Sequence, residues 1–186
     1  MNSLGALWLP ILLSAVIVFI ASSVIHMLLP WHKSDFKRLP QEDQIVAALR
    51  PLAIPPGDYM LPKPDSMQQL RSPEYADRLA KGPVLMMTVM PNGRTAMGGL
   101  LAKWFVYLLV VGLLAAAITV PLLPPGASRR VVFHTVAVAA FLGYTLALWQ
   151  MSIWYHRSWA TTIKSTVDGV IYALLTAATF AWLWPR

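Results

Sequence analysis

Cysteine is absent from the 186-residue sequence. Its absence excludes disulfides, thiolate zinc sites, Cys-ligated iron–sulfur clusters and thiol redox chemistry. The sequence also lacks a Gly-x-Ser-x-Gly elbow, a phosphate-binding Gly-Lys-Ser/Thr loop and a His-Glu-x-x-His pair, the marks of common hydrolases, nucleotide-binding proteins and metallopeptidases. No motif in the sequence therefore indicates a particular reaction, and a non-enzymatic role is expected.

Charged residues are also scarce, at 12% of the chain, whereas hydrophobic residues make up 57%. A typical soluble domain is about 25% charged, so this chain has too few charges to cover a globule of its size. The net charge of +7 comes from basic residues that gather at the ends of apolar segments, where they orient a chain and meet anionic lipid. The expected partner is therefore the lipid bilayer and not nucleic acid.

Four long apolar stretches fill most of the sequence. A membrane-spanning helix needs about 20 mostly apolar residues, and the stretches that qualify are about 7–29, 104–123, 131–155 and 165–184. The fourth is the weakest because Asp168 interrupts it, and we expect this residue at the membrane interface, where the helix begins. The predicted fold is an all-α integral membrane protein, with residues 1–186 forming one four-transmembrane-helix bundle.

The distribution of Lys and Arg predicts the orientation, because positive charge is retained on the cytoplasmic side. Near their membrane ends, the first and third connections carry Lys33, Lys37, Arg38, Arg50, Arg94, Lys103, Arg157 and Lys164. The opposite side has only Arg129, Arg130 and Arg186. We expect a multi-pass protein of the bacterial cytoplasmic (inner) membrane, with both termini outside the cytoplasm and the first connection inside.

The first connection, residues 31–103, is expected to form a small cytoplasmic cap. Pro40 is placed to begin a short helix that Pro51 ends. Ser72 and Gly82 are suited to begin and end a second one as its N-cap and C-cap. The cap is thus predicted to contain two short helices.

A β-hairpin is predicted in the same cap. Asn92-Gly93 lies between two extended runs, residues 84–90 and 94–97. An Asn-Gly pair between such runs is a strong hairpin signal.

Small residues recur every four positions in the predicted spans. This spacing lets helix backbones approach closely inside a bilayer. Packing within one chain explains it best, and a seam with another subunit or a second copy is the alternative. The candidate packing residues are Gly112, Ala116, Ala139, Gly143, Ala147, Gly169, Ala173, Ala177 and Ala181.

A few ionisable residues are expected at membrane depth, where such residues mark functional sites by default. His26, His156 and Asp168 fall in one shallow inner layer of the predicted topology. They are candidates for a polar or proton site, and His26 with His156 for haem or metal ligation. The ligand set is thin, with no Glu-x-x-His or His-x-x-x-His pair, so no metal or other cofactor is expected.

These observations favour a non-enzymatic accessory, assembly or structural subunit of a larger membrane complex. Two alternatives remain open. One is a small oligomeric transporter or channel, and the other is a haem- or metal-binding membrane protein that uses His26 and His156.

Overall fold

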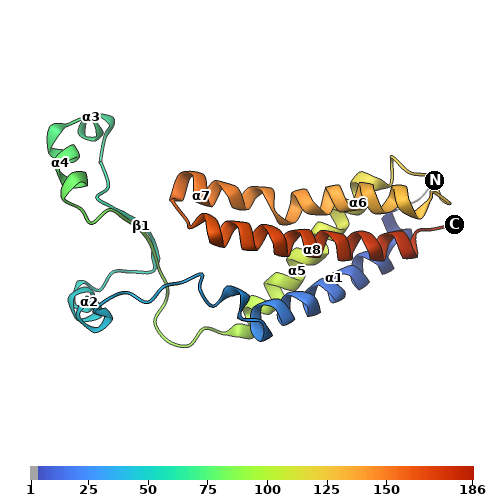
Figure 1. Cartoon of the computed structure of the whole chain (residues 1–186), viewed down its shortest axis with the longest axis horizontal. Helices are drawn as coiled ribbons and strands as arrows, with labels where there is room; N and C mark the ends of the chain where they lie inside the picture. Colours follow the sequence, from blue (N-terminus) through green and yellow to red (C-terminus); the bar gives the residue numbers. More distant parts are fainter. Residues whose placement is uncertain (1–3) are drawn as a thin grey trace. The chain divides into compact units, whose positions relative to one another are not determined.

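The structure is a computed structural model that describes residues 4–186. The chain divides into two compact units. We call Met1–Lys37 with Ala96–Arg186 the helical unit, and Arg38–Thr95 the connecting unit (Figure 1).

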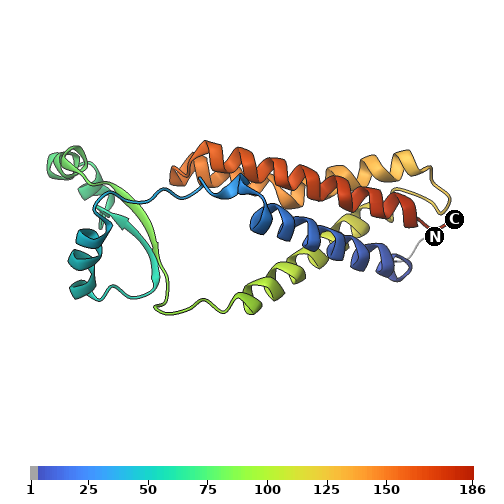
Figure 2. The same ribbon diagram turned by 60° about the horizontal axis from the view of Figure 1, so that its bottom comes forward.

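Among its described residues, the helical unit contains four helices long and apolar enough to cross a membrane, as the sequence predicts. They span Leu4–Leu28, Met97–Thr119, Arg129–Tyr155 and Trp159–Leu183. Their parts are η1 (Leu4–Leu7), α1 (Trp8–Ser23), η2 (Val24–Leu28), α5 (Met97–Thr119), α6 (Arg129–Tyr144), η5 (Leu146–Leu148), α7 (Trp149–Tyr155) and α8 (Trp159–Leu183). Figure 2 shows α8 running along α6 and α1, both of which pack against it.

The fourth span begins at Trp159, earlier than predicted, so the expectation that Asp168 begins the helix is wrong. The polar residues before Asp168 are helical, and the hydroxyl groups of two of them bond to the helix itself. Ser165 Oγ donates to the Thr161 carbonyl and Thr166 Oγ1 to the Thr162 carbonyl, at 2.9 and 2.8 Å. Asp168 is therefore carried well inside α8 and is buried.

The third span is interrupted where the sequence predicts one continuous helix. α6 ends at Tyr144, and η5 leads into α7. At the break, Thr145 leaves helical geometry (φ −125°, ψ −50°), and it is buried. A Cβ added at Gly169 of α8 would overlap the methyl group of Thr145, so the two helices meet closely at this point.

Most of the predicted packing residues lie inside the bundle. Gly169, Ala173, Ala177, Ala181, Gly112 and Ala116 are buried, Ala139 is half-buried, and Gly143 and Ala147 are exposed. A Cβ at Gly143 would nevertheless lie 3.2 Å from Val111 Cγ1, and one at Gly112 would lie 3.5 Å from Ile11 Cγ2. The small residues of α8 and α5 thus serve contacts within this chain.

We expect Gly169→Ala to destabilise the helical unit by about 1–3 kcal/mol, the usual cost of overpacking a core. The added methyl group meets the short, buried side chain of Thr145, which has little room to move. Gly98→Ala is the matched control, because nothing lies within 4 Å of its Cβ position in α5. Heating both variants in detergent compares them, and equal midpoints would contradict the close contact.

The two ends of the described chain lie together at one end of the helical unit (Figure 1). Leu7 and Trp184 belong to the same buried core cluster. Trp184 Nε1 donates to the Pro124 carbonyl at 3.1 Å, and the Gly126 amide donates to the Pro185 carbonyl at 2.8 Å. Both ends of the described chain therefore lie on the same side of the helical unit as the connection between the second and third spans.

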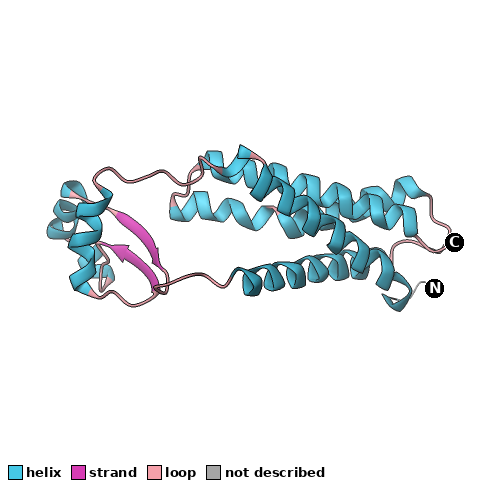
Figure 3. Cartoon of the chain, turned by 90° about the horizontal axis from the view of Figure 1, so that it is seen from below, coloured by secondary structure: helices cyan, strands magenta, loops and turns pink. Residues whose placement is uncertain are grey.

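The connecting unit contains both predicted short helices and a different sheet. The helices are α2 (Glu42–Leu49) and α4 (Pro73–Lys81), the latter with Ser72 as N-cap and Gly82 as C-cap, as predicted. Also present are η4 (Arg50–Leu52) and α3 (Met67–Leu70). Strand β2 (Leu85–Val89) pairs antiparallel with β1 (Gly57–Leu61), from Gly57↔Val89 to Leu61↔Leu85 (Figure 3).

The predicted hairpin about Asn92-Gly93 is therefore wrong. The segment after this pair is short and forms no strand, because α5 already begins at Met97. β2 instead pairs with a strand that precedes it by a long excursion through α3 and α4. Thr88 Oγ1 donates to Asp58 Oδ1 at 2.6 Å across this pairing.

Candidate functional site

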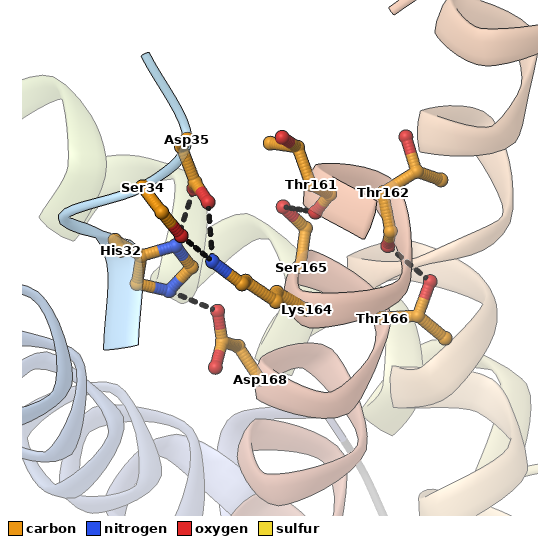
Figure 4. A network of polar contacts seen from close by, with 9 residues as sticks. All are labelled: His32, Ser34, Asp35, Thr161, Thr162, Lys164, Ser165, Thr166 and Asp168. Atoms are coloured by element: carbon orange, nitrogen blue, oxygen red, sulfur yellow. Dashed lines mark hydrogen bonds and ion pairs between the residues drawn. The ribbon is translucent and has the colours of Figure 1, made fainter. Parts of the chain in front are cut away.

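A polar cluster joins the segment that follows the first span to the interior of α8. Pro30 ends the first helix, and the 3-10 turn η3 (Pro30–His32) places His32 against α8. Figure 4 shows His32, Ser34 and Asp35 on this segment facing Lys164 and Asp168 of α8. All of these residues belong to the helical unit.

His32 lies between two carboxylates. Its Nδ1 is 2.6 Å from Asp35 Oδ2, and its Nε2 is 2.8 Å from Asp168 Oδ2. When both carboxylates are ionised, both ring nitrogens donate, which is the bonding of an imidazolium. Asp35 Oδ1 also accepts from Lys164 Nζ at 2.9 Å, and the same ammonium donates to Ser34 Oγ at 2.8 Å.

The cluster is largely shielded from solvent. The side chains of His32, Asp35, Lys164 and Asp168 are 14%, 8%, 18% and 5% exposed. Burial raises the pKa of Asp35, but hydrogen bonds from His32 and Lys164 outweigh burial and hold that pKa below its usual value. With His32 protonated, two positive and two negative groups balance, as buried charges require.

His26 extends the cluster from the π-helical turn η2. Its ring stacks on His32, with centroids 4.2 Å apart and planes 22° from parallel. One ligand atom from each of His26, His32 and Asp168 lies within 4.8 Å of the other two. His26 is exposed, so the cluster reaches the surface of the helical unit there.

The structure brings together two of the three ionisable residues singled out in the sequence, His26 and Asp168. His156 lies apart from that group, as the exposed C-cap of α7 with a left-handed backbone (φ 54°). His32 takes its place. Lys164 lies one turn before Asp168 in α8, but its ammonium donates to Asp35, whereas the Asp168 carboxylate contacts His32.

A cavity of about 300 Å³ adjoins the cluster. His26, Ser165 and Asp168 line one part, and the rings of Trp104, Tyr107, Tyr144 and Tyr172 line another. Neighbouring rings have centroids 5.3–6.1 Å apart. The Tyr172 hydroxyl is buried and has no hydrogen-bond partner among residues 4–186.

The chemistry open to these groups is limited. The cluster can tether the segment after the first span, exchange a proton at His32, or supply two imidazole nitrogens and a carboxylate oxygen to a metal ion.

Comparisons with protein families, with curated proteins and with solved structures find no match for this chain. Its function must therefore be argued from the geometry.

Proposed function

We propose that this chain is a multi-pass protein of the bacterial cytoplasmic membrane that binds a divalent transition metal through His26, His32 and Asp168. The observation that supports this most directly is that one ligand atom of each residue lies within 4.8 Å of the ligand atoms of the other two. Metal bonds of about 2.0–2.2 Å hold neighbouring ligand atoms about 3–3.5 Å apart. A bound ion would therefore take the place of the proton between His32 Nε2 and Asp168 Oδ2, which lie 2.8 Å apart, and would draw His26 toward them. The sequence alone predicts no metal site because it does not place His32 beside the other two residues.

The groups behind the ligands also support a metal centre. A ligating histidine usually donates its second ring N–H to a carboxylate, which fixes the tautomer and the ring orientation. Asp35 accepts that bond from His32 Nδ1, and Lys164 holds Asp35 in place. With Nδ1 protonated, the Nε2 lone pair is directed to the side on which Asp168 lies.

Two nitrogen ligands and one carboxylate suit Zn²⁺, Fe²⁺, Co²⁺ or Ni²⁺ better than Ca²⁺ or Mg²⁺, which prefer oxygen. The direct test is metal analysis of protein purified without a chelator, followed by titration of the stripped protein with Co²⁺. We expect one equivalent to bind and to give visible ligand-field absorption. Binding no tighter than that of a His26→Ala variant would overturn the proposal.

The proposed orientation places both termini outside the cytoplasm and the connecting unit inside. The Lys and Arg bias supports it, and the packing of Leu7 with Trp184 in one core cluster supports placing both ends of the chain on the same side. The metal ligands then lie at the inner leaflet.

Reporter fusions test this orientation. A reporter after Arg186 is expected to be active outside the cytoplasm, and one within residues 55–64 only inside it. A cytoplasmic C-terminus would contradict the orientation.

An accessory role in a larger membrane complex is the second candidate, and the connecting unit favours it. Within Arg38–Thr95, which the structure describes completely, only Pro62 and Tyr75 are buried. Large apolar side chains such as Leu52, Met67 and Met90 are 63–72% exposed. Native mass in mild detergent tests for a partner subunit, and a homo-oligomer would favour a small transporter or channel instead.

A further inference from the structure

We infer that the cavity beside the polar cluster binds the headgroup of a lipid-soluble quinone. This goes beyond metal binding, because none of the four rings that line the cavity is a metal ligand. The cavity is formed only by residues of the four apolar spans. A ligand that is soluble in the bilayer is therefore the kind that these spans would meet.

The lining favours a flat ring. Trp104, Tyr107, Tyr144 and Tyr172 form a connected set of aromatic contacts, one stacked and three edge-to-face. Such rings bind other ring systems by offset stacking or edge-to-face contact. A volume of about 300 Å³ is at the low end for small-molecule sites and suits a single substituted ring.

The polar groups favour a ring that carries a carbonyl oxygen. The buried Tyr172 hydroxyl lacks a partner among the described residues, and an unsatisfied buried donor costs free energy that a ligand acceptor would recover. Trp104 Nε1 donates to Ser22 Oγ at 2.9 Å and the Tyr107 hydroxyl to the Gly143 carbonyl at 2.6 Å, whereas the Tyr172 hydroxyl is left to donate to a ligand. A quinone carbonyl accepts such a bond, whereas a lipid acyl chain offers no acceptor.

The charges of the cluster argue against an organic cation in this cavity. Asp168 is the acid that lines it, and His32 already pairs with this carboxylate at 2.8 Å. A neutral ligand needs no further charge to balance it. Tyr107 is 38% exposed and His26 is exposed, which gives the ring a way in from the surface of the helical unit.

Quenching of tryptophan fluorescence by a decyl-substituted para-benzoquinone tests the inference, with the full chain in nanodiscs. EDTA is present throughout, so that failure of the metal proposal leaves this result unaffected. Saturable quenching is expected, and Trp104→Phe should remove it. Decylbenzene, which has the chain and ring but no carbonyl, should compete at least about tenfold more weakly.

Tyr172→Phe should weaken quinone binding about tenfold, because it removes the free donor and keeps the ring. The variant is expected to fold normally, since its hydroxyl makes no bond within the described chain. Tyr155→Phe is the matched control, because Tyr155 is exposed on α7 and does not line the cavity. The inference would be overturned if Tyr172→Phe bound the quinone as tightly as the unaltered protein, or if decylbenzene competed as well as the quinone itself. Either result would indicate a binding site for an acyl chain.

Discussion

Asp168→Asn is expected to weaken Co²⁺ or Zn²⁺ binding by more than about 100-fold, which exceeds the cost of losing a group that is only hydrogen-bonded to a metal ligand. The amide keeps the size of the side chain but loses the anionic oxygen that faces His32 at 2.8 Å. Asp35→Asn removes only the group behind His32, so a smaller loss of about 10–100-fold is expected. Isothermal titration of the stripped protein measures both variants.

His156→Ala is the control for this series, since His156 lies outside the cluster. Its affinity for metal should equal that of the unaltered protein. If His156→Ala weakened metal binding as much as Asp168→Asn does, the ligands would include His156, as in the alternative considered from the sequence, and the cluster would be contradicted.

Lys164→Met is expected to destabilise the helical unit by about 1.5–3 kcal/mol, the cost of losing a hydrogen bond to a charged group, because Asp35 keeps its bond from His32. It leaves the Asp35 carboxylate, which is 8% exposed, without its ammonium partner. The methionine keeps most of the aliphatic stem, so the lost packing is small. Unfolding in a denaturing detergent gives the change in stability.

Lys81→Met is the matched control, because it breaks the Lys81–Asp77 ion pair in which both side chains are mostly exposed, at 74% and 57%. Solvent screens such a pair, so no measurable change is expected. If Lys164→Met were equally harmless, the cluster would not tether the segment after the first span.

The membrane spans could be predicted from the sequence because each is a local property of about 20 consecutive residues. The caps of α4 were predictable for the same reason, since Ser72 and Gly82 act on their own helix ends. The partner of β2 could not be predicted, because a strand selects its neighbour through pairing along its whole length. The local Asn-Gly signal was outweighed by pairing with the distant β1.

The candidate site was predictable only in part. His26 and Asp168 stand out because ionisable residues are rare in apolar helices. His32 lies in a short turn after Pro30, and its partner Asp168 is 136 positions away, so no sequence periodicity links them. The start of α8 was also obscured, because Thr and Ser read as loop residues until their side chains bond to the helix carbonyls.

The acid inside α8 has a consequence for how the protein is made. Of the four spans, α8 has the lowest mean hydropathy and the largest buried share, and an aspartate near a helix centre costs about 2.5–3.5 kcal/mol on insertion. We expect this span to enter the bilayer unaided least readily, and to be retained once His32 and the earlier helices receive it. The contact between His32 and Asp168 would then form only in a chain whose four spans have all inserted. A chain in which α8 has not inserted would expose Asp168 without its partner to quality-control proteases.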